Sequence, residues 1–75
     1  TVLYFAALRD AAGVTSEVVA PGGTLRDLYQ RLRERHRFTW QASQLRVAVD
    51  GAFASWDDSV QPGSEVAFIP PVSGG

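Results

Sequence analysis

Hydrophobic and polar residues alternate along this chain in short runs that predict β-strands. Residues 2–8 form an apolar run of strand-forming side chains, and residues 15–20 form a second run that stops at a Pro-Gly-Gly turn signal. In residues 45–50 every second side chain is hydrophobic, which is typical of a strand with one buried face. An Asp-Gly pair then predicts a tight turn into a return strand at 52–54, and residues 64–69 form the last strand.

One segment, residues 25–36, has the period of an amphipathic helix. Its apolar side chains recur at helical spacing and form one stripe: Leu25, Leu28, Tyr29, Leu32 and His36. Thr24 is a favourable N-cap, and Asp27 resembles the acid of a capping box. Charged residues occupy the opposite side, so we expect this helix to lay one face against a sheet.

These elements predict a single α+β domain over residues 1–75. The order is strand, strand, helix and then three strands, and the simplest packing is a mixed sheet of about five strands curled around the one main helix. The first and last strands are both apolar, so we expect them to pair in parallel at the sheet centre. This is the β-grasp, or ubiquitin-like, arrangement, followed here by a flexible tail at residues 70–75.

Composition and charge exclude several classes of protein. A net charge of -1 provides no attraction to nucleic acid or to an anionic membrane. No apolar run approaches the length of about 20 residues that a spanning helix needs, so we expect a cytoplasmic protein without membrane contact. The sequence has no Cys, which excludes disulfides, thiolate metal sites and a Cys nucleophile.

Side chains that could carry out catalysis or bind a metal are few. The only histidine, His36, lies at the end of the predicted helix, where an interaction with the helix dipole is the simplest interpretation. Asp57 and Asp58 are adjacent in a predicted turn, where carboxylates usually cap or face solvent. We therefore predict no metal site and no bound cofactor.

The end of the chain forms an unusual tail: Pro70, Pro71, Val72, Ser73, Gly74 and Gly75. The prolines favour extended backbone, so the last strand should continue stiffly without sheet hydrogen bonds. The final five residues can reach about 16–18 Å beyond Pro70, and the glycines can pass where side chains would clash. Such a tail suits insertion into a partner's channel. Its terminal carboxylate is a poor electrophile and needs activation by another enzyme.

All seven basic residues are Arg, and Lys is absent. A coding bias toward Arg is the simpler explanation. The functional one is that a protein with an activated terminal acyl group benefits from having no side-chain amine to acylate. Both explanations remain open.

Both ends of the chain resemble the small subunit of molybdopterin synthase, a ubiquitin-like sulfur-carrier family. The similarity at the start lies in VLYFA at residues 2–6 with Leu8 and Arg9, and at the end in PGSEVAFIPPVSGG at residues 62–75. A terminal Gly-Gly is shared by all ubiquitin-like carriers, whereas VAFIPPVSGG is much more specific. The resemblance runs the full length of the chain.

The resemblance implies a mechanism centred on Gly75. An adenylyltransferase similar to the enzymes that activate ubiquitin would adenylate Gly75 with ATP, and a sulfur donor would convert the acyl-adenylate to a thiocarboxylate. The large synthase subunit would accept the tail and move the sulfur onto a cyclic pterin monophosphate in molybdenum cofactor biosynthesis. That subunit would supply the catalytic side chains, in a heterotetramer with two copies of each subunit. Arg9, in the matching motif, is implied as a partner contact.

The alternation also predicts a surface for a partner. Only one face of the sheet can meet the helix, so we expect Phe5, Phe53 and Ile69 on the other face as an apolar patch. Patches of this kind mark interfaces. A covering loop or the curl of the sheet is the alternative fate of these side chains.

Three other functions compete with the molybdopterin synthase carrier. They are a sulfur carrier for thiamine or cysteine biosynthesis, a ubiquitin-like modifier conjugated to lysines, and a binding module with an incidental Gly-Gly end. The Pro-Pro-Val before Ser-Gly-Gly favours the molybdopterin synthase carrier over carriers of other pathways.

Overall fold

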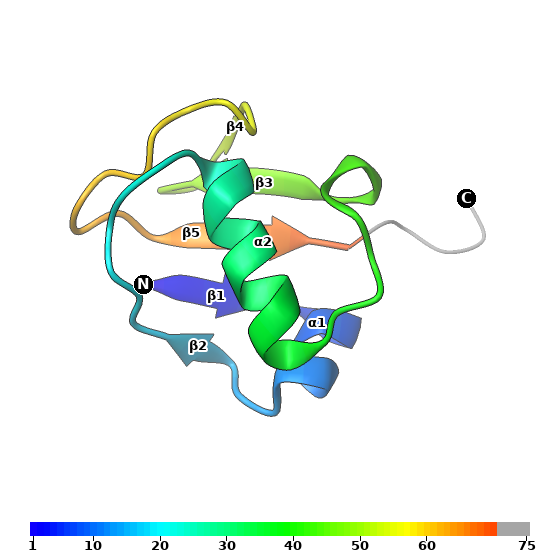
Figure 1. The fold of residues 1–75 in the computed structure, drawn as a ribbon. Coiled ribbons are helices and arrows are strands. Elements are labelled where there is room, and N and C mark those ends of the chain that lie inside the picture. Colours follow the sequence, from blue (N-terminus) through cyan, green and yellow to red (C-terminus); the bar gives the residue numbers. More distant parts are fainter. Residues whose placement is uncertain (71–75) are drawn as a thin grey trace.

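The computed structural model describes residues 1–70 and contains one mixed sheet with a helix across one face (Figure 1). The elements follow the order β1 (Val2–Tyr4), α1 (Ala6–Ala12), β2 (Ser16–Glu17), α2 (Leu25–His36), the 3₁₀ turn η1 (Ala42–Gln44), β3 (Arg46–Val49), β4 (Ala52–Ala54) and β5 (Val66–Ile69). Their order within the sheet is β2-β1-β5-β3-β4. The expected β-grasp fold is confirmed.

The last strand, β5, lies at the centre of the sheet. It pairs in parallel with β1, as predicted, with Val2 opposite Val66 and Tyr4 opposite Phe68. Its other edge pairs antiparallel with β3, and β2 and β4 form the margins of the sheet. Both edges of β5 are therefore hydrogen-bonded, so the final strand joins the two halves of the sheet.

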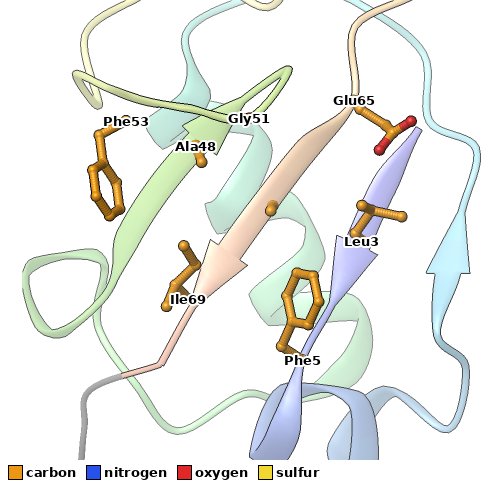
Figure 2. A pocket seen from close by; sticks show the side chains of 8 residues that line it. Leu3, Phe5, Ala48, Gly51, Phe53, Glu65 and Ile69 are labelled. Atoms are coloured by element: carbon orange, nitrogen blue, oxygen red, sulfur yellow. The ribbon is translucent and has the colours of Figure 1, made fainter.

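The core lies between the sheet and α2. Every second residue of β1 and β5 points inward and is at most 3% exposed: Val2, Tyr4, Val66 and Phe68. Four of the five residues in the predicted stripe of α2 pack on them: Leu25, Leu28, Tyr29 and Leu32. The Tyr29 ring meets Phe68 edge-on at 5.1 Å, and its hydroxyl donates to the Trp40 carbonyl at 2.7 Å. Figure 2 shows the other side of the sheet, which α2 does not cover.

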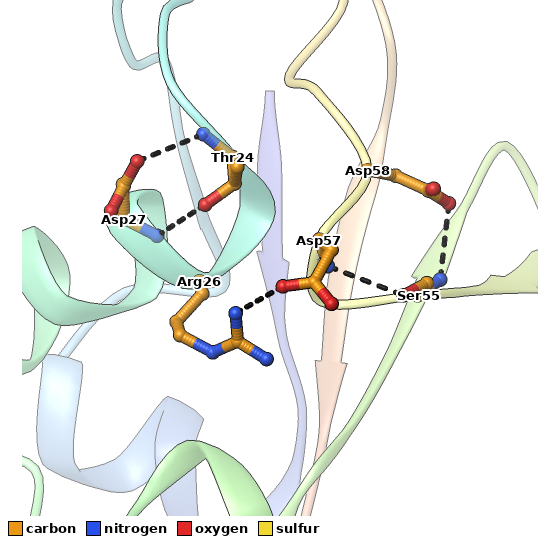
Figure 3. A network of polar contacts seen from close by, with 6 residues as sticks. All are labelled: Thr24, Arg26, Asp27, Ser55, Asp57 and Asp58. Atoms are coloured by element: carbon orange, nitrogen blue, oxygen red, sulfur yellow. Dashed lines mark hydrogen bonds and ion pairs between the residues drawn. The ribbon is translucent and has the colours of Figure 1, made fainter.

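The start of α2 is fixed by a complete capping box (Figure 3). The Asp27 N–H donates to Oγ1 of Thr24 at 3.2 Å, and the Thr24 N–H donates to Oδ2 of Asp27 at 3.1 Å. These bonds hold the pKa of Asp27 below its usual value. The capping box predicted from the sequence is confirmed.

The prediction of a strand over residues 2–8 is wrong after Tyr4, where β1 ends. Ala6 adopts a left-handed backbone with φ 48° and begins α1, which turns Leu8 into the core. The apolar run therefore combines a strand with a buried helical turn, and periodicity over so few residues does not separate the two. Gly13, at φ 78°, ends α1.

The other predicted strands differ in how closely they match the structure. The run at residues 15–20 contributes only Ser16–Glu17 to the sheet, and Val18 is 84% exposed. The three later predicted strands are confirmed as β3, β4 and β5, each within two residues of its expected bounds.

The connection from β4 to β5 is tied to the first turn of α2 by polar contacts (Figure 3). The Asp57 carboxylate pairs with the Arg26 guanidinium, and the backbone N–H of Arg26 donates to the Trp56 carbonyl at 3.0 Å. Oδ2 of Asp58 accepts a hydrogen bond from the Ser55 N–H at 3.1 Å. The Asp58 carboxylate therefore caps the turn, as its sequence position predicts, whereas the Asp57 carboxylate links the turn to α2.

A partly buried polar cluster fastens β2 to the end of α2. Glu17 accepts hydrogen bonds from the Tyr4 hydroxyl and, at 2.9 Å, from Arg35. Its Oε1 also lies 2.6 Å from Nε2 of His36, whose ring packs edge-on against Tyr4 at 5.6 Å. His36 thus has a carboxylate partner that its position in the sequence did not predict.

The pKa of Glu17 reflects this cluster. Burial raises it, but the hydrogen bonds from Tyr4, His36 and Arg35 and the charge of His36 together hold it below the usual 4.5. Because folding lowers this pKa, the stabilisation is fully present above the unfolded-chain value. It is lost as the pH falls through the lower folded-state value.

Glu17→Gln is expected to destabilise the fold at neutral pH by about 1–3 kcal/mol, because the amide removes the charged acceptor of three donors. The variant should also lose less stability than the wild type on acidification from about pH 5 to about pH 3. Urea unfolding at several pH values measures both effects. Glu34→Gln, at an exposed position of α2, is the control and should behave like the wild type. An identical acid dependence in Glu17→Gln and the wild type would contradict the role of the cluster.

Candidate functional site

The side of the sheet away from α2 carries a hollow of about 300 Å³ (Figure 2). Six apolar residues that line it are called here the outer face: Leu3, Phe5, Ala48, Phe53, Ala67 and Ile69. Glu65 lines one end of the same hollow.

Strand pairing assembles the outer face from four strands, β1, β3, β4 and β5, and from Phe5, the residue that follows β1. Leu3 of β1 and Ala48 of β3 both lie opposite Ala67 of β5. Phe53 of β4 lies opposite Ala48. Neighbours across strands on one face have Cβ atoms about 4.5–5.5 Å apart, so the two alanines form a low floor between larger side chains.

Two phenylalanines of the outer face are exposed to solvent, Phe5 to 47% and Phe53 to 68%. Ile69 is partly buried beside them. The predicted placement of these three side chains on one exposed face is confirmed, and within residues 1–70 no loop covers them. Their role in binding a partner stays a prediction.

Arg9 lies apart from this surface. It is exposed on α1 and borders a different hollow, together with Asp10, Gly13, Val14 and Thr15. The structure therefore does not bring Arg9 into the outer face. The contact with a partner implied for Arg9 stays a prediction.

The chain leaves the sheet beside the outer face. Ile69 ends β5 and Pro70 follows, and both border a second hollow, of about 500 Å³, together with Phe53. The other predicted tail residues lie outside the described residues: Pro71, Val72, Ser73, Gly74 and Gly75. The predicted flexibility of the tail falls outside them as well.

The described part of the chain offers little to side-chain chemistry. Within residues 1–70, no group of three or more His, Asp or Glu is placed to hold a metal ion. No helix in this range has the length and apolar character to cross a membrane. What the described residues do offer is an apolar surface, the outer face, next to Pro70, where the chain leaves the sheet.

Two charged residues near the outer face, Arg46 and Glu65, are absent from the predicted site. The guanidinium carbon of Arg46 lies 5.4 Å from the centre of the Phe53 ring. A signal for this contact was present, because the Asp-Gly turn sets the hairpin register and places Arg46 diagonally across from Phe53. No local sequence pattern predicts that Glu65 lies near the outer face, because its position depends on the long-range pairing of β5.

Comparison with known proteins adds the family. Residues 2–75 match the family model described as the ThiS family. This chain belongs to the ThiS family. The match extends beyond β5 and includes the tail residues of the ThiS-family chain.

Two relatives of this ThiS-family protein, one bacterial and one human, carry the same name. The chain is 36% identical to the molybdopterin synthase sulfur carrier subunit of Escherichia coli, over 99% of this chain and 96% of the relative. It is 34% identical to the human protein of the same name, over 99% and 91% of the two chains. Among solved structures, a candidate molybdopterin converting factor, subunit 1, from Pyrococcus furiosus is similar with a TM-score of 0.76, at 34% identity, over 95% and 94% of the chains.

Phe53 and Phe68 provide a matched test of the two sheet faces. Phe68→Ala removes a side chain that is 0% exposed and is expected to cost about 3–5 kcal/mol of unfolding free energy. Phe53→Ala, at 68% exposure, should cost less than about 1 kcal/mol. Chemical denaturation of both variants measures the difference. Similar losses would mean that the outer face belongs to the core.

Proposed function

We propose that this chain is the sulfur carrier subunit of molybdopterin synthase and that its chemistry takes place at the carboxyl group of Gly75. The observation that carries the proposal is the position of the outer face. Its exposed aromatic side chains lie beside Ile69 and Pro70, where the chain continues toward Gly75. A partner docked on this face would receive the chain end next to its own surface. Full-length similarity to carriers of this name supports the proposal.

The carboxylate of Gly75 must be activated before sulfur can be attached. In the proposal an adenylyltransferase of the ubiquitin-activating kind uses ATP: the carboxylate attacks the α-phosphate, pyrophosphate leaves and an acyl-adenylate forms. Sulfur transfer then displaces AMP and leaves a thiocarboxylate. ATP is bound by the activating enzyme, and the carrier holds no cofactor. A glycine at the reacting end leaves the carbonyl open to attack.

In the proposal the carrier and the large subunit have different roles in sulfur insertion. The carrier contributes the docking surface and a nucleophilic sulfur. The large subunit of the synthase accepts the tail, contributes the catalytic side chains and directs the sulfur onto the cyclic pterin precursor of molybdenum cofactor biosynthesis. A heterotetramer with two copies of each subunit and a cytoplasmic location complete the proposal.

Other ubiquitin-like proteins share the fold and the Gly-Gly end but make different products. A carrier for thiamine or cysteine biosynthesis would pass its sulfur to another acceptor. A modifier would form an isopeptide bond with lysines of other proteins and would keep no thiocarboxylate. The names of the Escherichia coli and human relatives favour molybdopterin synthase.

Sulfur loading can be measured against a background without sulfur. The chain contains neither Cys nor Met, so a thiocarboxylate would be its only sulfur atom. Incubation with ATP, the activating enzyme and a sulfur donor is expected to replace one oxygen by sulfur at Gly75. A thiol-alkylating reagent should then label the loaded protein and leave the unloaded protein unmodified. Intact-mass and fragmentation spectra measure both.

Deletion of Gly75 is the matched control for this experiment. It should abolish loading and leave the Tm unchanged, because a glycine contributes no side chain to the core. Sulfur or label elsewhere in the chain, or molybdopterin formation by the deletion variant with purified partners, would contradict the mechanism. Isopeptide-linked products without a thiocarboxylate would identify a modifier.

Phe5→Glu is expected to weaken binding of the large subunit by about tenfold or more, because it buries an unpaired charge in an apolar contact. Its Tm should change little, since Phe5 is 47% exposed and lies outside the core cluster. Titration calorimetry with the purified large subunit and thermal unfolding measure the two effects.

Val18→Glu provides the matched control for Phe5→Glu. Val18 is 84% exposed and borders a groove beside α2, away from the outer face. Val18→Glu should bind the large subunit with the same affinity as the wild type. The docking role of Phe5 is wrong if Phe5→Glu unfolds the domain or binds the large subunit with wild-type affinity.

A further inference from the structure

We infer that two opposite charges on the outer face dictate how the partner is oriented: Arg46 at the end where the chain departs toward Gly75, and Glu65 at the other end. The inference rests on the proposed function, in which the large subunit docks on this face. It specifies the chemistry of the partner surface. That surface should be apolar, with an Asp or Glu opposite Arg46 and a Lys or Arg opposite Glu65.

Arg46 is positioned to bind a carboxylate of the partner. It lies opposite Ile69 in the β3–β5 pairing and borders the same hollow as Pro70. Its guanidinium carbon is 5.4 Å from the centre of the Phe53 ring, a contact that restrains the side chain without using its N–H donors. None of the ion pairs within residues 1–70 includes Arg46. Its planar set of donors therefore matches a partner carboxylate in geometry and charge.

Acidic residues border the opposite end of the outer face. The Glu65 N–H donates to Oδ1 of Asp50 at 2.9 Å, and the Asp50 N–H donates to the Glu65 carbonyl at 2.9 Å. The Asp50 carboxylate is thereby engaged in the turn, whereas the exposed Glu65 side chain lines the hollow (Figure 2). Of the two, Glu65 is the acid that a docked partner would meet.

The spacing of these charges makes them independent. Glu65 precedes Ile69, the residue opposite Arg46, by four positions, which corresponds to about 13 Å along a strand. This exceeds the Debye length of about 8 Å at physiological salt, so the two charges do not neutralise each other. The outer face is therefore positive at one end and negative at the other.

Apolar contact alone does not specify an orientation. Phe5 and Phe53 lie on opposite sides of the hollow, so a partner rotated by half a turn in the plane of the sheet would still bury aromatic surface (Figure 2). The rotated partner would bring like charges together at both ends, which is unfavourable. Only one of the two orientations places the partner's acceptor site beside Pro70. The charges therefore select the orientation that sulfur transfer needs.

Charge-reversal variants of the full chain, titrated with the purified large subunit at about 50 mM and about 500 mM NaCl, test the inference. Arg46→Glu is expected to weaken binding by about tenfold at low salt and by much less at high salt. Arg46→Gln should show a smaller effect with the same dependence on salt, and it replaces Arg46→Glu should that variant fail to fold. Arg31→Glu, on α2 at the other side of the sheet, makes the same change in net charge. It should bind within about twofold of the wild type.

Rescue experiments identify the partner's residue. Changing, one at a time, the Asp and Glu residues that border the partner's apolar surface to Arg should yield one variant that restores binding to Arg46→Glu. Equal affinities of Arg46→Glu and the wild type, an equal loss at both salt concentrations, or the same loss in Arg31→Glu would overturn the inference. Failure of the wild type to bind the large subunit at all would instead overturn the proposed function.

Discussion

The structure depends on the parallel pairing of β1 with β5. Parallel neighbours cannot be joined by a tight turn, so every other element lies in the connection between them. This connection covers one side of the sheet with α2 and leaves the other side uncovered (Figures 1 and 2). It also makes the last strand the central one. A single register, Val2 opposite Val66, thus decides which side chains form the core, which form the outer face and where the chain leaves the sheet.

Successive side chains of a strand point to opposite faces of the sheet, so one set stabilises the fold and the other set is available to bind a partner. Phe68 points inward and stabilises the domain, whereas Phe53 is 68% exposed and contributes little to its stability. A phenylalanine buries about 150–250 Å², and roughly half of this remains for a partner at Phe5 and Phe53, about 2–3 kcal/mol each before the cost of association. That amount suits a complex that forms and dissociates. A carrier needs such a complex, because it must leave one enzyme to reach the next.

Local signals made much of this structure predictable from the sequence. The capping box at Thr24, the stripe of α2 and the Asp-Gly hairpin each depend on residues close together in the chain, and alternation alone placed Phe5, Phe53 and Ile69 on one face. The turn at Ala6 was not predictable, because a left-handed backbone is usually marked by glycine, and its absence made residues 6–8 resemble a strand. Glu65 reaches the outer face through long-range pairing, which no short window of sequence contains.

The length of the tail limits where the two proposed partners can dock. Five residues beyond Pro70 span at most about 16–18 Å, so any active site that reaches Gly75 must lie within that distance of Pro70. Pro70 itself borders a hollow shared with Phe53 and Ile69 of the outer face. An activating enzyme and a large subunit that both act on Gly75 must therefore approach the same end of the sheet, and two proteins of ordinary size cannot occupy it together. Activation precedes transfer because the carboxylate is a poor electrophile. Exclusion at one surface adds that the carrier has to release the first enzyme before the second can bind.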